Sequence, residues 1–145
     1  MRFLGKYHFL SNFYSCKMTA WGIEFPTSEH VYVAAKTLSS TLRKKVAGIS
    51  TPGQAKRFGR TFRLRYDWKE VRVPMMESIL RRKFEQPDLR TRLLEIEEEI
   101  IEHNVWHDNF WGICICGRDL CNSGKNILGL LLMTLRKDLM EKSDN

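Results

Sequence analysis

Two segments of the chain carry the residue types best suited to acid–base chemistry. Glu29, Tyr32 and Lys36 are spaced i, i+3 and i+7, so a helix would place a carboxylate, a phenol and an ammonium group on one face. Glu29 would lie in the first turn, where backbone N–H groups also attract anions. The second segment, residues 102–112, gathers acids, imidazoles, amides and two indoles. From these residues alone, a solvated helix face and a capped turn with core tryptophans are the better interpretations.

The histidines and cysteines do not follow a usual metal-binding pattern. His103 and His107 are four residues apart, but an asparagine follows His103 where a zinc protease has glutamate, and we do not expect a helix here. Cys114, Cys116 and Cys121 form C-x-C-x4-C instead of paired C-x2-C spacing. The alternating Cys114 and Cys116 are explained more simply as small apolar residues on one face of a strand. A metal site is therefore a minor hypothesis, and we predict reduced thiols and no bound metal.

A glycine-bounded segment before the last expected helix could bind phosphate. Gly124, Lys125 and Asn126 open that helix, where backbone N–H groups and an ammonium group can meet an anion. The sequence GRDLCNSGKNILG fails the Walker pattern, because asparagine follows the lysine and the first glycine is misplaced. ATP hydrolysis is therefore not expected, and the alternative interpretation is an ordinary glycine-containing turn.

The elements that would position these residues indicate a helix-dominated α+β fold, with a few short strands in one compact domain over residues 1–145. Loose alternation around Trp21-Gly22 predicts a short hairpin over residues 16–25, which Pro26 ends. The run from Phe110 to Cys116 predicts a strand. Apolar spacing, N-caps and prolines predict helices over residues 29–38, 42–49, 52–58, 68–84, 87–94 and 126–140.

Composition limits the class of protein. A chain of 145 residues that is 43% hydrophobic can bury a core without disulfides, and no apolar run approaches the roughly 18–20 residues of a membrane span. We expect no signal peptide in MRFLGKYHFL and place the protein in the cytoplasm. The net charge of +7 predicts an anionic partner, and residues 36–92 contain 16 Lys and Arg against 5 Asp and Glu. Such a segment suits a phosphorylated metabolite or a nucleic acid.

The order of several short motifs resembles the NADAR, or YbiA-like, superfamily over nearly the whole chain. Spaced blocks in a fixed order are far more specific than any single block. One departure is the stretch 113–122, which carries cysteines, Arg118 and Asp119 where family members run quickly into the last block, and we expect it to reshape the substrate pocket. The matching blocks are FLSNFY (9–14), PTSEHVY (26–32) with Ala35-Lys36, Gly59-Arg60, Asp67-Trp68, KFEQ (83–86), Glu102-His103, DNFWG (108–112) and GKNILG (124–129).

This resemblance implies an N-glycosidase that requires neither cofactor nor metal. Similar bacterial proteins hydrolyse the N-glycosidic bond of phosphorylated ribosylamino-pyrimidines, which are early riboflavin-pathway intermediates, and release ribose 5-phosphate. The family's functional positions correspond to Glu29, Trp68 and Asp108. By analogy with glycoside hydrolases, we expect Glu29 and Asp108 to share the acid, base and cation-stabilising tasks, with Trp68 stacked on the base. The residues predicted to bind substrate are Asn12, Phe13, Tyr32, Lys36, Arg60, Trp111, Lys125 and Asn126.

Three alternatives stay open at this point. Other members of the superfamily are associated with ADP-ribose, so removal of ADP-ribose from a nucleobase, with modified nucleic acid as a substrate, is the second candidate activity. Trp68 could instead be a core aromatic at a helix start. A non-enzymatic nucleic-acid-binding domain built on residues 36–92 ranks below both enzymes, because aromatics are sparse there and no helix-turn-helix or zinc-finger pattern occurs. No membrane partner is expected.

Overall fold

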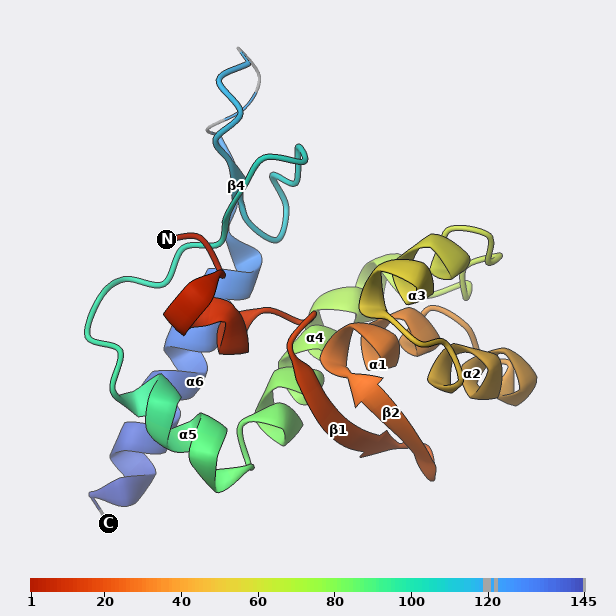
Figure 1. The fold of residues 1–145 in the computed structure, drawn as a ribbon, viewed down its shortest axis with the longest axis horizontal. Coiled ribbons are helices and arrows are strands. Elements are labelled where there is room, and N and C mark those ends of the chain that lie inside the picture. Colours follow the sequence, from red (N-terminus) through yellow and green to blue (C-terminus); the bar gives the residue numbers. More distant parts are fainter. Residues whose placement is uncertain (119–120, 122, 145) are drawn as a thin grey trace. The chain divides into compact units, whose positions relative to one another are not determined.

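Helices make up most of the regular structure and the strands are few and short, which confirms the predicted α+β class (Figure 1). The computed structural model describes residues 1–118, 121 and 123–144, so Asp119 of the inserted stretch lies outside the described residues. The chain divides into a continuous unit, residues 11–83, and a second unit that combines residues 1–10 with residues 84–145. The single domain over residues 1–145 stays a prediction. Among the described helices, none has the length and apolar character needed to cross a membrane.

A β-hairpin begins the continuous unit. Strands β1 (Ser15–Ala20) and β2 (Ile23–Thr27) pair antiparallel. Trp21 and Gly22 form the turn between them, and both have positive φ, 52° and 71°, which suits the right-handed twist of a two-residue hairpin. Alternate residues of β1 are buried, so one face of the hairpin packs on the core. The predicted hairpin is confirmed, although Pro26 lies within β2 instead of ending it.

Four helices complete this unit. The side chains of Thr27, Ser39 and Thr51 each accept a hydrogen bond from a backbone N–H three residues on, and these caps begin the first three helices. Residues 37–39 are not helical and Ser39 caps the next helix, so the first helix stops three residues before the predicted position and the second begins two residues early. The helices are α1 (Ser28–Ala35), α2 (Ser40–Ala47), α3 (Pro52–Gly59) and α4 (Trp68–Lys83).

The core of the continuous unit is largely apolar, but it also buries two charged residues, Glu29 and Lys83. Lys83, the last residue of α4, has no exposed surface. Its Nζ donates to the carbonyl oxygen of Ser11 at 2.8 Å and lies 5.8 Å from the ring centre of Tyr14. Burial lowers the pKa of Lys83 to about 8, because the charged form loses its hydration. The fully buried apolar side chains around this core include Phe25, Val33, Val46, Ala55, Met76 and Leu80.

The second unit joins the beginning of the chain to its last part. Contacts between distant residues hold the N-terminal segment: the Oη of Tyr7 donates to the Oε1 of Glu98 at 3.0 Å, and the guanidinium of Arg92 lies 4.2 Å from the ring centre of Phe9. Strands β3 and β4 form a two-residue parallel pair. The elements are the 3-10 helix η1 (Gly5–Leu10), α5 (Pro87–Leu94), β3 (His103–Asn104), β4 (Ile113–Cys114) and α6 (Ile127–Ser143).

The strand predicted over residues 110–116 is wrong for most of its length, since only β4 is extended and paired. Polar side chains take the backbone N–H groups that strand pairing would need. The Oδ1 of Asp108 accepts from the N–H groups of residues 110 and 111, at 3.0 and 2.9 Å, and the Oδ1 of Asn109 accepts from the N–H of Cys114 at 2.9 Å. These local hydrogen bonds compete with the sheet and turn the chain before β4.

Candidate active site

Glu29 is held at the buried start of α1. Its backbone N–H donates to the carbonyl oxygen of Asn12 at 2.9 Å, and the Oγ of Ser28 donates to the Oδ1 of Asn12 at 2.8 Å. The Nδ2 of Asn12 lies 3.4 Å from the sulfur of Met76 on α4. Glu29 is 7% exposed and Asn12 is 8% exposed. The predicted carboxylate therefore lies in a largely dehydrated position, where charges interact more strongly than in water.

A buried polar network fixes the same helix start. The Oγ1 of Thr27 accepts from the backbone N–H of His30 at 3.2 Å and lies 2.7 Å from the His30 Nδ1, while the Nε2 of His30 lies 2.8 Å from the carbonyl oxygen of Ile49. Burial lowers the pKa of His30, and the hydrogen bond to Ile49 acts in the opposite direction. A neutral imidazole satisfies both contacts, so His30 links α1 to the segment before α3.

Lys36 follows α1 directly and interacts with several charges of its own unit. Burial is the main reason that the pKa of Lys36 is lowered. Glu29 raises this pKa, whereas the nearby cations Lys56 and Arg60 lower it further. The Nζ of Lys36 also lies 5.4 Å from the ring centre of Tyr32. The predicted face of carboxylate, phenol and ammonium is therefore present, and two further cations, Lys56 and Arg60, act on its ammonium group.

Aromatic rings adjoin this charged group. The rings of Tyr32 and Trp68 are 5.3 Å apart and tilted by 53°, and both side chains are buried, at 9% and 8% exposure. Phe13 is 39% exposed, and the Nζ of Lys56 lies 5.9 Å from its ring centre. Trp68 thus packs against a ring of its own chain, while Phe13 presents open aromatic surface.

In the second unit, Asp108 is part of an ordered turn. The Nδ2 of Asn104 donates to the carbonyl oxygen of Asp108 at 2.8 Å and to the Oε2 of Glu102 at 3.0 Å. The backbone N–H of Asp108 donates to the Oδ1 of Asn104 at 3.1 Å. The Asp108 carboxylate uses its Oδ1 to cap the turn, and its Oδ2 has no hydrogen-bond partner within the described part of the chain. One oxygen is therefore fixed by the turn and the other can meet a ligand.

Asn126, the residue before α6, braces the same unit. Its Oδ1 accepts from the N–H of Glu102 at 2.9 Å, its Nδ2 donates to the carbonyl oxygen of Ile100 at 3.0 Å, and its backbone is left-handed with φ 51°. Lys125 is exposed, and its N–H donates to the carbonyl oxygen of Asn109 at 2.8 Å. The ring of Trp111, half-buried, lies 4.8 Å from that of Phe110.

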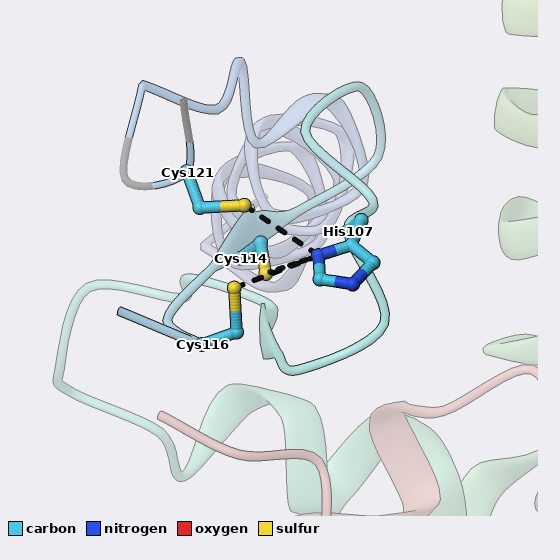
Figure 2. A group of neighbouring side chains, drawn as sticks. All are labelled: His107, Cys114, Cys116 and Cys121. Atoms are coloured by element: carbon cyan, nitrogen blue, oxygen red, sulfur yellow. Dashed lines mark hydrogen bonds between the residues drawn. The ribbon is translucent and has the colours of Figure 1, made fainter. Parts of the chain in front are cut away.

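Three thiols and an imidazole form a further group in this unit, and Figure 2 shows the three sulfur atoms converging on one ring nitrogen. The Nδ1 of His107 lies 3.7 Å from the Sγ of Cys114, 3.5 Å from that of Cys116 and 3.6 Å from that of Cys121. Desolvation raises the pKa of Cys114, but hydrogen bonds from Cys116 and Cys121 outweigh it and lower this pKa to about 6. Hydrogen bonds with Cys114 and Cys116 raise the pKa of Cys121 to about 11.

This group corrects our interpretation of the cysteines. Cys114 and Cys116 are not merely small apolar residues of a strand, because the strand ends at Cys114 and both sulfurs turn toward His107. His103, the other histidine of the i, i+4 pair, lies apart from them, with its Nδ1 2.6 Å from the N-terminal amine. The spacing argument against a metal centre does not hold in three dimensions, since the four ligand atoms lie within 4.8 Å of one another.

The predicted site residues fall into two sets. The structure connects Glu29, Tyr32, Lys36 and Trp68 within the continuous unit, where Asn12, Phe13 and Arg60 also belong. Asp108, Trp111, Lys125 and Asn126 belong to the second unit. Sequence reasoning missed Lys56, although its i, i+4 spacing with Arg60 was a signal. It also missed the bracing role of Asn104, which has no sequence signature.

Comparison with protein families and curated proteins gives consistent results. A family model described as the NADAR domain matches residues 2–140. The protein named N-glycosidase YbiA of Escherichia coli (strain K12) is 37% identical over 132 residues, which cover 89% of this chain and 79% of that protein. A riboflavin biosynthesis protein of Vibrio vulnificus (strain YJ016) is 38% identical over 136 residues, which cover 92% of this chain but 36% of the relative. The chain thus spans about a third of the Vibrio protein.

A solved structure is similar in fold. The NMR structure of the Escherichia coli protein YbiA matches with a TM-score of 0.83 and 35% sequence identity, and the match covers 100% of this chain and 88% of that one. This likeness supports the helix-rich fold that the motif order predicted.

Proposed function

The chain belongs to the NADAR domain family, and from this premise we propose that it is an N-glycosidase that hydrolyses the C1′–N bond of a phosphorylated ribosylamino-pyrimidine of riboflavin metabolism. Water adds across the bond: its oxygen joins C1′, a proton goes to the leaving nitrogen, and ribose 5-phosphate and the free amine are released. Relatives named N-glycosidase and riboflavin biosynthesis protein support this reaction class.

The observation that carries the proposal is the buried carboxylate of Glu29 in the same unit as Lys36, which two further cations repel. Lys56 and Arg60 each disfavour the charged form of Lys36, whereas Glu29 favours it. A bound phosphate dianion would relieve that repulsion and would form charge-assisted hydrogen bonds with an ammonium or guanidinium group. The continuous unit therefore offers a phosphate site beside a carboxylate.

The carboxylate suits the charge that develops when the bond breaks. Departure of the amine leaves positive charge on the ribose, and a fixed anion in a dehydrated position stabilises that charge or accepts a proton from attacking water. Glu29 is the group that meets both conditions in the continuous unit. Phe13, which is 39% exposed, offers a ring face for the pyrimidine, and Trp68 forms a buried aromatic pair with Tyr32 in the same unit.

Asp108 as the second carboxylate stays a prediction. Its Oδ1 is held by two backbone N–H groups, which fixes the carboxylate and leaves Oδ2 for a proton transfer. Lys125 and Trp111, which belong to the same unit, also stay predicted substrate-binding residues. The side-chain amide of Asn126 is engaged with residues 100 and 102, so its predicted contact with ribose would use the remaining hydrogen-bonding capacity.

Release of ribose 5-phosphate from the ribosylamino-pyrimidine phosphate, measured with the purified chain, tests the proposal. Replacing Glu29 with Gln is expected to lower kcat about 10²–10⁴-fold, the usual effect of removing one acid–base group. Lys36→Met is expected to act mainly on KM for the phosphorylated substrate. Glu24→Gln on the exposed face of β2 is the matched control and should leave turnover unchanged.

Two outcomes would overturn parts of this proposal. Full turnover by the Glu29→Gln enzyme would remove the carboxylate from the mechanism. An ADP-ribosylated nucleobase assayed in parallel separates the substrate classes. If the chain hydrolyses this substrate but releases no ribose 5-phosphate from the ribosylamino-pyrimidine phosphate, its activity is ADP-ribose removal instead.

A further inference from the structure

The four side chains of Figure 2 come from one short stretch of the second unit. His107 follows β3, Cys114 ends β4, and Cys116 and Cys121 follow within the stretch that departs from the family pattern. Cys114 is fully buried, Cys116 and Cys121 are half-buried and His107 is exposed. The cluster therefore lies at the surface of its unit, with one sulfur anchored in the interior.

Hydrogen bonding alone does not account for this arrangement. A ring nitrogen of histidine either carries one proton or offers one lone pair, so it makes one strong hydrogen bond. Here three sulfur atoms approach the same Nδ1 at nearly equal distances, 3.5 to 3.7 Å. A disulfide would bring two of the sulfurs to about 2 Å from each other and exclude the third. Equal approach of three sulfurs to one nitrogen is the pattern of ligands that share a central cation.

The distances also match tetrahedral coordination. With a Zn–S bond of about 2.3 Å and a Zn–N bond of about 2.0–2.1 Å, two tetrahedral ligands of these kinds are about 3.6 Å apart. The three observed nitrogen–sulfur distances agree with that value within about 0.1 Å. Three thiolates and one imidazole are soft ligands that favour Zn²⁺ over Mg²⁺ or Ca²⁺, which prefer oxygen.

Neighbouring groups support the thiolates. The Nδ2 of Asn109 lies 3.8 Å from the sulfur of Cys121, and its Oδ1 accepts from the N–H of Cys114, so one amide orients two of the ligands. His107 has a left-handed backbone with φ 69°, and Gly117 next to Cys116 has φ 87°. These uncommon conformations turn the chain so that side chains on either side of β4 face one point.

We propose that His107, Cys114, Cys116 and Cys121 form a structural zinc site. Four protein ligands complete the tetrahedron and leave no open position for water, which distinguishes a structural site from a catalytic one. The ion would tie residue 107 to residue 121 and fix the turn that contains Asp108. Any effect of this turn on catalysis rests on the proposed function, whereas the zinc site itself does not.

Metal analysis of the purified 145-residue chain tests the site directly. Inductively coupled plasma mass spectrometry is expected to find one zinc ion per chain after reconstitution with Zn²⁺ under reducing conditions and removal of excess metal. Replacement by Co²⁺ is expected to give the intense visible bands of tetrahedral coordination and a sulfur-to-cobalt charge-transfer band. Absence of stoichiometric metal, a weak octahedral cobalt spectrum, or a disulfide between two of the three cysteines in freshly purified protein would overturn the proposal.

Cysteine variants locate the ion. The double variant Cys116→Ser/Cys121→Ser leaves two ligands, so its zinc content is expected to fall to background. The control Cys16→Ser removes the one cysteine outside the cluster and should keep one zinc per chain. A chelator is expected to lower the Tm of the unmodified chain but not that of the double variant, because only the former loses a bound ligand. Zinc retained by the double variant would refute the ligand assignment. None of these readouts uses the glycosidase substrate, so failure of one proposal leaves the other testable.

Discussion

Replacing Gly129 with alanine is expected to destabilise the protein, although alanine has a higher helix propensity than glycine. Gly129 is the third residue of α6, and a Cβ there would lie 2.2 Å from the carbonyl oxygen of Ile100 and 2.4–2.5 Å from the amide atoms of Asn126. That amide makes two buried hydrogen bonds, to the N–H of Glu102 and the carbonyl oxygen of Ile100. Losing both costs about 2–6 kcal/mol, at about 1–3 kcal/mol for each unsatisfied group. Alanine regains about 1 kcal/mol of propensity, so Gly129→Ala should cost about 1–5 kcal/mol.

Urea unfolding followed by circular dichroism measures this difference, and the sign alone decides between the two effects. Gly53→Ala on α3 is the matched control, because a Cβ there meets no atom within 4 Å. It should stabilise the protein by about 0.5–1 kcal/mol through propensity. If Gly129→Ala also stabilises the protein, the close packing of residues 100, 126 and 129 is wrong.

Two further predictions concern the continuous unit. Burial lowers the pKa of Lys83 from 10.5 to about 8, so the unfolded chain binds more protons than the folded chain between pH 8 and 10.5. The free energy of unfolding should therefore rise by about 3 kcal/mol over this pH range. Urea unfolding should show that rise in the unmodified chain but not in Lys83→Met. Thr27→Val removes the α1 cap and the hydroxyl partner of His30, so it should lower the free energy of unfolding by about 2–4 kcal/mol in the same assay. Thr51→Val, at the exposed start of α3, should lower it by about 1 kcal/mol. Equal losses for the two variants would contradict the buried network.

The helices were predictable because their limits depend on local chemistry. Thr51 with Pro52 gave the start of α3, and Pro87 gave that of α5, since a capping hydroxyl and a fixed φ act on the nearest residues. The predicted end of α1 was three residues too late, because residues 37–39 are not helical and Ser39 caps the next helix.

Residues 100–126 were the least predictable part of the chain. Among the described residues of this stretch, several backbone N–H groups donate to the side chains of Asn104, Asp108, Asn109 and Asn126, and such contacts leave no periodic pattern. Spacing left a metal site only a minor hypothesis, because linear separation does not report how close His107 lies to the three cysteines in space. In contrast, the Glu29 face was visible from helical spacing, while Lys56 joins it only through the packing of α3 beside α1.

The division of the chain also sets an order for its synthesis. Residues 11–83 leave the ribosome as one continuous stretch and contain all of their unit's strands and helices, so that unit can fold while translation continues. Phe9 and Tyr7 emerge earlier, yet their partners Arg92 and Glu98 are made more than eighty residues later. The segment FLGKYHFL is therefore without these native contacts on the nascent chain for most of translation, and its apolar side chains are then open to aggregation or to capture by a chaperone.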